Sequence, residues 1–358
     1  ALFMALKDAH GGRAYTTWEE ELRDRREEAL LSARETYARE TEFYRFLQYE
    51  FYKEWDALKS YANKKKVKII GDIPIYVAHD SADVWANPRL FRMKENGEPE
   101  AVAGCPPDAF AKTGQLWGNP LYDWEYHKKT GYAWWIARIA HCLALYDVVR
   151  IDHFRGFEAY YAIPYGHKTA EMGVWEKGPG LALFKAAEKK LGKLPIIAED
   201  LGFLTKSVKK LLKKSGYPGM KVLQFAFGAD DDSEYLPYKY RRNCVVYTGT
   251  HDNDTTVSWA ESLPPKELRF CARFLGVDDR EEKELPREIC RALVRTALSS
   301  PADLAVIPMQ DWLELGKEAR INTPSTLGDN WRWRLNGDEC TEKLAKRIRK
   351  LTKVYGRA

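Results

Sequence analysis

Short apolar runs alternate with amphipathic stretches along most of the chain. The runs are rich in Val and Ile, which suit strands packed on both faces. The stretches between them repeat apolar residues near every third or fourth position, which is typical of helices. Because strands that alternate with helices form βα units around a parallel sheet, the pattern predicts an α/β fold. The six predicted strands lie at 67–77, 148–151, 194–200, 220–227, 244–248 and 304–309, and the predicted helices at 133–146, 184–191, 205–214, 265–275, 286–299 and 339–354.

A helical segment precedes the first strand, and two long loops interrupt the later alternation. Residues 19–65 are rich in Glu, Arg, Ala and Leu and are predicted to be helical with one break. We therefore expect a helical subdomain at 1–66 and a (β/α) domain at 67–358, with long loop insertions at 78–124 and 153–183. A loop longer than about 15 residues is usually functional or disordered, and the aromatic content of the first loop argues against disorder.

The first six residues have the pattern of the end of an amphipathic helix, with no capping residue before it. We therefore expect that an N-terminal portion is missing from this sequence.

Three of the predicted strands lead into an acidic residue, namely Asp152, Glu199 and Asp252. In a (β/α)8 barrel, catalytic residues lie at the C-terminal ends of the strands. A doubly wound sheet also binds ligands there, but no glycine-rich phosphate loop follows any of these strands. We therefore predict a (β/α)8 TIM barrel with helical insertions, in which the first two strands are missing from this chain.

Composition narrows the class of protein further. Of the 358 residues, 45% are hydrophobic and 30% are charged, which is enough for a large core. The net charge is +5, but basic and acidic residues are interspersed, so we expect no nucleic-acid partner. No apolar run approaches the about 20 residues that cross a bilayer, so we expect no membrane partner. The 12 Trp and 20 Tyr residues are many, and such side chains in loops form flat platforms for sugar rings.

Cysteines and histidines form no metal-binding or redox motif. The six cysteines lie far apart without CxxC or CxxH spacing, and reduced thiols suit a cytoplasmic protein. His79 and Asp80 have no third ligand at a useful spacing. We expect neither a metal nor a cofactor, and the sequence predicts no oligomeric state.

Arg150 and Asp152 are two positions apart in one predicted strand, so their side chains point to the same face. A guanidinium beside a carboxylate lowers the pKa of that carboxylate and keeps it ionised at neutral pH. An ionised carboxylate at a strand end is a candidate nucleophile. For an arbitrary Arg-x-Asp pair, a structural ion pair is the commoner explanation, so the interpretation depends on the other strand ends.

The other two acidic strand ends complete a set that suits glycosyl transfer. That reaction needs one ionised and one protonated carboxyl group beside the bond. Glu199 follows the apolar run 196–198, an environment that raises a carboxyl pKa and suits a general acid/base. Asp252, preceded by His251, is placed to stabilise an oxocarbenium-like transition state. Spacing alone does not assign these roles.

Several sequence blocks resemble one enzyme family. They are similar to the 4-α-glucanotransferases (amylomaltase, or disproportionating enzyme), which belong to the α-amylase clan. General α-amylases lack the Trp-Gly-Asn-Pro loop that this chain carries at 117–120. The resembling blocks are 71–77, 79–85, 104–108, 114–122, 150–156, 197–202, 249–253 and 320–326.

The resemblance implies a role for each matching residue. Asp152 would be the nucleophile that forms a covalent glycosyl-enzyme. Glu199 would protonate the leaving oxygen and then deprotonate the incoming 4-hydroxyl, and Asp252 would stabilise the transition state. The substrates would be α-1,4-glucans such as maltooligosaccharides, amylose, glycogen or starch. The residues implied to bind the glucan or to support this trio are Arg150, His251, Asp72, Asp108, Trp117, Asn322 and Phe225.

Two rival functions stay open on the sequence. A hydrolase of the same α-1,4 bonds would use the same three carboxyl groups, with water as the acceptor. A non-catalytic glucan-binding fragment would keep the aromatic platforms without turnover. A covering loop such as 104–122 would exclude water from the intermediate and favour transfer.

Overall fold

The computed structural model describes residues 1–107, 112–202, 204–228 and 232–357. It divides into two compact units, Ala1–Tyr217 and Pro218–Ala358, and each unit is described by itself. The predicted subdomain boundary at residue 66 does not coincide with this division. Phe3 and Trp18 pack into the same core as Ile73, and the helical subdomain at 1–66 stays a prediction.

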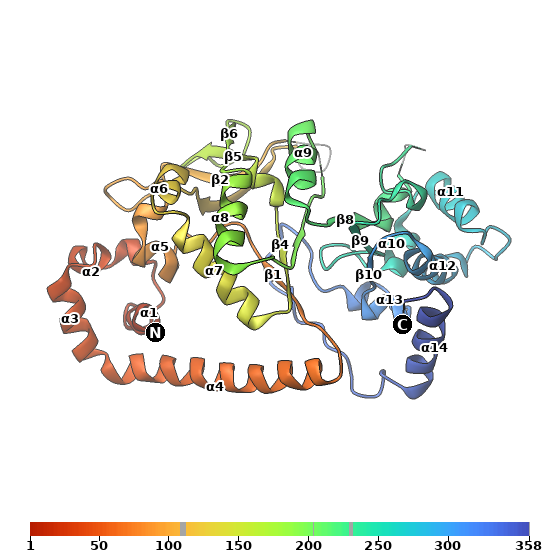
Figure 1. Cartoon of the computed structure of the whole chain (residues 1–358), viewed down its shortest axis with the longest axis horizontal. Helices are drawn as coiled ribbons and strands as arrows, with labels where there is room; N and C mark the ends of the chain where they lie inside the picture. The colour runs from red at the N-terminus through yellow and green to blue at the C-terminus, as the bar shows by residue number, and fades with distance from the viewer. Residues whose placement is uncertain (108–111, 203, 229–231, 358) are drawn as a thin grey trace. The chain divides into compact units, whose positions relative to one another are not determined.

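The first unit begins with helices, as predicted. The helical segment was expected to have one break and has two: residues 24–26 separate α2 from α3, and Tyr37 separates α3 from α4 (Figure 1). Several large apolar side chains of α4 are exposed, including Phe43 and Phe46 at 55% each. These helices are α1 (Leu2–Ala9), η1 (Tyr15–Thr17), α2 (Glu20–Arg23), α3 (Glu27–Thr36) and α4 (Ala38–Lys64).

A three-stranded parallel sheet follows, and two of its strands lead into acidic residues that the sequence singled out, Asp152 and Glu199. Its order is β1 (Ile70–Ile73), β4 (Val148–Ile151) and β7 (Ile196–Ala198). The helix α7 (Ala133–Leu145) packs against β1 and β4, and its Trp135 and Ile139 are fully buried. Because β4 has a neighbour on both sides, all its backbone groups can pair within the sheet. The other helices here are α8 (Leu181–Leu191) and α9 (Lys206–Ser215).

The two segments predicted as long loops form an antiparallel sheet instead. Its order is β3 (Gln115–Pro120), β2 (Ala101–Cys105), β5 (Ala159–Pro164) and β6 (Val174–Lys177). The prediction of loops was wrong here because β2 pairs with β5, which is far away in the sequence. Such pairing leaves no local periodic signal. The remaining elements of these segments are α5 (Ala82–Ala86), η2 (Pro88–Leu90), α6 (Trp124–Lys129) and η3 (Phe154–Phe157).

The second unit holds the other three predicted strands in a parallel sheet with the order β10-β9-β8. In this unit the helix α12 contacts the elements α10, α11, α13, α14 and β10. The strands are β8 (Gly219–Val222), β9 (Cys244–Tyr247) and β10 (Leu304–Val306); the helices are η4 (Leu223–Ala226), η5 (Pro237–Lys239), α10 (Thr256–Ser262), α11 (Pro265–Leu275), α12 (Leu285–Ser299), α13 (Met309–Leu313), η6 (Lys317–Ala319) and α14 (Glu342–Val354).

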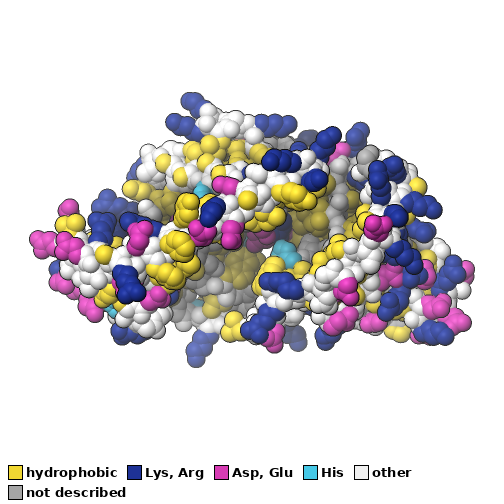
Figure 2. Space-filling view, turned by 90° about the horizontal axis from the view of Figure 1, so that it is seen from below, with side chains coloured by type: hydrophobic (Ala, Val, Ile, Leu, Met, Phe, Trp, Pro, Cys, Tyr) yellow, Lys and Arg dark blue, Asp and Glu magenta, His cyan; other side chains and the backbone are white. Residues whose placement is uncertain are grey.

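The surface matches the mixed charge pattern of the sequence. Lys and Arg side chains are interspersed with Asp and Glu over the face drawn in Figure 2, and hydrophobic side chains lie exposed among them. No helix in the described part of the chain combines the length and the apolar character that crossing a bilayer requires.

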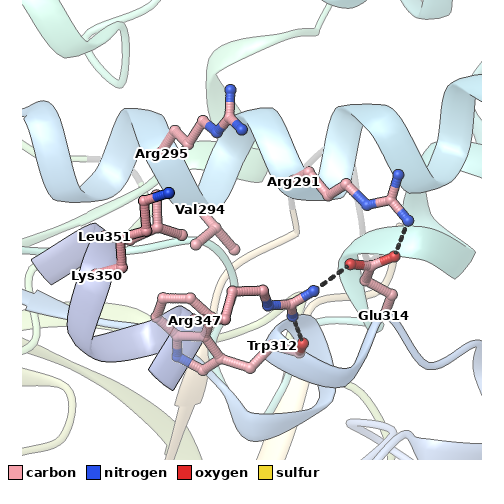
Figure 3. A pocket seen from close by; sticks show the side chains of 8 residues that line it. All are labelled: Arg291, Val294, Arg295, Trp312, Glu314, Arg347, Lys350 and Leu351. Atoms are coloured by element: carbon pink, nitrogen blue, oxygen red, sulfur yellow. Dashed lines mark hydrogen bonds and ion pairs between the residues drawn. The ribbon is translucent and has the colours of Figure 1, made fainter. Parts of the chain in front are cut away.

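A buried carboxylate joins α12 to α14 in the second unit. Glu314, only 8% exposed at its side chain, accepts from Arg291 Nη2 at 2.7 Å and from Arg347 Nη1 at 3.0 Å. Figure 3 shows this clamp beside a pocket with Trp312 and Val294 on its wall. Burial by itself raises the pKa of Glu314, but the two guanidinium groups outweigh it and hold the pKa below the usual value.

Replacing Glu314 by Gln should destabilise the protein, because two arginines lose their shared counter-charge. Both arginines are nearly half exposed, so we expect a loss of about 1–2 kcal/mol in the free energy of unfolding rather than the larger cost of a fully buried pair. A depressed pKa contributes stability above the unfolded-state pKa, and that contribution disappears as the pH falls through the folded-state pKa. In urea unfolding at pH 7, E314Q should therefore have a lower free energy of unfolding than the parent. The difference between the two free energies should disappear in acid.

The exposed pair of Glu342 with Lys346 on α14 provides the control. The variant E342Q should have the same free energy of unfolding as the parent, both at pH 7 and in acid. Equal free energies of unfolding of E314Q and E342Q at pH 7 would contradict the stabilising role of the contacts of Glu314 with the two arginines.

Candidate active site

Arg150 lies between two carboxylates near the C-terminal end of β4, the central strand of the first parallel sheet. It is 8% exposed, and the parallel register sets Asp72 of β1 directly beside it. Its Nη1 donates to Asp72 Oδ2 at 2.5 Å and its Nη2 donates to Asp152 Oδ1 at 2.9 Å. The predicted contact of Arg150 with Asp152 is therefore present, and Asp72 joins it. A planar guanidinium can contact two carboxylates at once in a fixed geometry.

The backbone around Asp152 is also fixed. Val149 and Ile151 are buried within the sheet, and the amide of Asp152 donates to the carbonyl of Ile73 at 3.0 Å. The carboxylate itself is 44% exposed. Asp152 thus presents an accessible oxygen from a rigid strand end, as a nucleophile requires.

Glu199 follows β7 and occupies a more enclosed place. Residues Ile196–Ala198 are buried, and both carboxyl oxygens accept backbone amides. Oε2 accepts from the amide of His153 at 2.7 Å, and Oε1 accepts from the amide of Leu201 at 2.6 Å. Burial, and next the negative charge of Asp152, raise the pKa of Glu199 to about 7, while Arg150 and the two amides oppose the rise. The prediction of an enclosed carboxyl group after an apolar strand agrees with this environment.

Trp117 of β3 lies close to the same strand end. Its indole Nε1 donates to Gln115 Oε1 at 3.0 Å, and its ring meets the ring of His153 edge-on with 4.8 Å between centroids. His153 directly follows Asp152. The antiparallel sheet thus brings an aromatic side chain predicted to bind glucan into contact with the residue that follows the predicted nucleophile.

The second unit builds its own cluster around Asp252, in the turn after β9. Asn322 Nδ2 donates to Asp252 Oδ1 at 2.6 Å, and His251 Nε2 lies 3.4 Å from Asp252 Oδ2. Three predicted site residues, Asp252, His251 and Asn322, are therefore brought together. Arg320 supports the cluster by donating Nη2 to the carbonyl of Asp252 at 3.1 Å.

A buried carboxylate that the sequence analysis missed holds this turn in place. Asp311, 3% exposed, accepts from the hydroxyl of Thr248 before the turn and from the amide and hydroxyl of Thr256 after it. Gln224 Nε2 adds a bond to the carbonyl of Asp254 at 3.0 Å. A Cβ at Gly249 would lie 2.6 Å from the same Nε2 atom, so a larger residue there would displace the amide of Gln224. The sequence signal for Asp311 was an acidic residue soon after the last strand.

Two predicted site residues are not part of these clusters. Phe225 lies in η4 of the second unit, 43% exposed, with its ring against Tyr235. Asp108 lies outside the described residues. The pocket in Figure 3 is lined by none of the predicted site residues. Within the described ranges, no group of three His, Cys, Asp or Glu side chains is arranged to hold a metal ion.

Comparison with known proteins decides the family. The family model described as 4-alpha-glucanotransferase matches residues 1–341. The chain belongs to the 4-alpha-glucanotransferase family. A 4-alpha-glucanotransferase of Clostridium butyricum is 49% identical over 359 residues, which is 100% of this chain and 72% of that protein. One from Streptococcus pneumoniae is 47% identical, with 100% and 70% covered.

A solved structure agrees with the family assignment. The amylomaltase from Streptococcus agalactiae in complex with acarbose has a TM-score of 0.95 and 39% identity, covering 100% of this chain and 72% of that one. The predicted family and enzyme class are therefore confirmed, and so is the predicted fold class, an α/β fold of the α-amylase type.

Exchanging Arg150 for Lys should reduce glucan transfer strongly. A single ammonium cannot reach Asp72 and Asp152 in the way that a guanidinium does, so Asp152 is no longer held in one orientation. A shift of about 1 Å in a reacting group can cost on the order of a hundredfold in rate. We expect kcat to fall by about ten- to a hundredfold in a maltotriose transfer assay.

Arg92 offers a matched control, because it also joins two carboxylates, those of Glu100 and of Glu176 in β6. The variant R92K should keep kcat within a few-fold of the parent, which is the typical scatter of surface changes. Equal losses in R150K and R92K would show that bridging arginines act on stability alone.

Proposed function

We propose that this chain transfers segments of α-1,4-glucans to the 4-hydroxyl of an acceptor sugar with retention of configuration. Asp152 is the proposed nucleophile, Glu199 the proposed general acid/base and Asp252 the proposed transition-state stabiliser. The substrates we propose are maltooligosaccharides, amylose, glycogen or starch. The proposal rests on one observation above all: two carboxyl groups at neighbouring strand ends have different environments.

Those environments suit different roles. Asp152 is half exposed, and its hydrogen bond to the guanidinium of Arg150 orients the carboxyl group. Glu199 is enclosed, with a pKa raised to about 7, so a large share of the molecules carry its proton near neutral pH. Pairs of carboxyl groups whose environments differ in this way are typical of glycoside chemistry.

The proposed reaction proceeds in two displacements. In the first, an oxygen of Asp152 bonds to the anomeric carbon, the bond to the leaving glucan breaks, and Glu199 gives its proton to the leaving oxygen. In the second, Glu199 takes the proton of the acceptor 4-hydroxyl, whose oxygen displaces Asp152. Asp252, held by Asn322, would stabilise the positive charge that develops on the sugar ring in both steps.

Transfer rather than hydrolysis requires that sugar outcompetes water at the intermediate. The hairpin of β2 and β3 supports this, because it holds Trp117 beside His153 and so near the proposed nucleophile. An aromatic ring there provides a platform for an acceptor sugar and displaces water. We also infer a cytoplasmic location from the scattered cysteines of the sequence.

Incubation with maltotriose separates the candidate functions. Transfer should give glucose together with a ladder of longer maltodextrins, visible by chromatography. Glucose and maltose without longer products would instead establish a hydrolase. Glucan binding by calorimetry without any product, unaffected by Asp152→Asn, would establish a binding protein.

The pH dependence provides a second test. The general acid must carry its proton to act, so kcat/KM should fall as the pH rises through about 7, the pKa of Glu199. Asp152→Asn should abolish transfer and also lower the pKa of Glu199, because it removes a neighbouring negative charge. Infrared titration of the carboxyl group, with Glu199→Gln as reference, measures that shift in the inactive variant.

Asp80→Asn is the control for this titration, because it removes a carboxylate that is paired with Lys7 elsewhere in the first unit. It should leave the pKa of Glu199 unchanged. Activity that persists in Asp152→Asn would refute the assignment of the nucleophile.

A further inference from the structure

His153 has a backbone conformation that is uncommon for a residue with a side chain. Its φ of 51° and ψ of 49° lie in the left-handed region. Glycine adopts this region freely, whereas His, Asn and Asp are tolerated and β-branched residues are strongly disfavoured. The residue sits immediately after Asp152, where the chain leaves β4, so the left-handed turn falls inside the proposed active site.

This turn directs backbone amides toward the end of the neighbouring strand. The amide of His153 donates to Glu199 Oε2 at 2.7 Å, and the next amide, that of Phe154, donates to the carbonyl of Glu199 at 3.0 Å. The carbonyl of His153 in turn accepts from the amide of Gly156 at 2.9 Å. An extended backbone at residue 153 would point the first two amides elsewhere, and Glu199 Oε2 would lose this donor.

The imidazole ring is held by packing. It meets Trp117 edge-on, with the two ring planes at 90°, and it lies against Gly156, where an added Cβ would come within 3.2 Å of its Cδ2 atom. Burial, assisted by the nearby charge of Arg155, lowers the pKa of His153 to about 3. The ring is therefore neutral near pH 7 and contributes through its packing against Trp117 and Gly156.

We propose that His153 is a positioning residue for the general acid/base: its left-handed backbone aims an amide at Glu199, and Trp117 locks the ring that keeps the backbone there. The inference rests on the proposed role of Glu199 as acid/base. It assigns the effect to the conformation of the main chain at residue 153 and not to imidazole chemistry.

Two substitutions distinguish the effect of the backbone conformation at residue 153 from the effect of its side chain. His153→Gly removes the ring but adopts the left-handed conformation without penalty, whereas His153→Val resists that conformation. The amide bond stabilises the ionised carboxylate, so losing it raises the pKa of Glu199. The other groups that act on Glu199, namely Asp152, Arg150 and the amide of Leu201, are the same in both variants.

We therefore expect His153→Val to lower kcat by on the order of a hundredfold and to move the alkaline limb of the kcat/KM profile to higher pH. His153→Gly should keep the parental profile and stay within about tenfold of the parental kcat, although it should melt earlier because the packed ring is gone. His153→Asn, which tolerates the left-handed region, should follow the Gly variant. If His153→Val does not fold, the Ala and Gly variants repeat the comparison with a smaller conformational difference.

Infrared titration of Glu199 in each variant provides a readout that is independent of turnover. Equal pKa values of Glu199 in the Gly variant and in the Val or Ala variant would overturn the proposal. So would a profile in His153→Gly that shifts as far as that of His153→Val, because the imidazole would then be the active part. Absence of transfer in the parent, together with the expected titration shifts, would refute the proposed function and leave the positioning role intact.

Discussion

The ion cluster of Arg150 with Asp72 and Asp152 constrains the register of β1 against β4 in the first parallel sheet. A guanidinium that is 8% exposed must be neutralised and hydrogen-bonded within the protein. It obtains one carboxylate from its own strand and the other from β1. A one-residue slip of β1 against β4 would turn Asp72 to the opposite face and break its ion pair with the guanidinium. The charge cluster and the strand register therefore support each other.

Glu199 depends on the same cluster through electrostatics. Its pKa reflects a balance in which burial and the charge of Asp152 act against Arg150 and two backbone amides. All of these contributions to the pKa come from the surroundings of Glu199. The pKa of the proposed general acid/base is thereby set by two segments of the chain, the one that carries Arg150, Asp152 and His153 and the one that carries Leu201.

The elements that the sequence predicted well are those with a local signal. The six parallel strands are apolar runs with β-branched residues, and α7, α11 and α12 show helical spacing. The acidic strand ends were recognisable for the same reason, since each follows such a run. The antiparallel sheet could not be predicted, because the pairing of β2 with β5, which makes one sheet of its four strands, joins segments far apart in the sequence. Asp311 was missed because its function depends on Thr248 and Thr256, which reach it only through the fold. His153 was missed because a left-handed backbone leaves no mark in a sequence unless the residue is glycine.

The two proposed catalytic clusters are held by different physical means. Asp152 and Glu199 stand at the ends of paired strands, so the hydrogen-bond ladder of the sheet fixes their positions. Asp252 stands in a turn, and side chains hold it: Asn322 at its carboxylate and Arg320 at its carbonyl. Ladder bonds are lost only with the sheet. Asp311 fixes both ends of the turn, but the carboxylate of Asp252 itself can shift when the side chains that contact it shift. The segment that carries Arg320 and Asn322 therefore governs Asp252 more directly than β9 does. Two groups that must keep a fixed geometry relative to one sugar carbon suit a sheet edge, and a group that only stabilises charge tolerates the softer support.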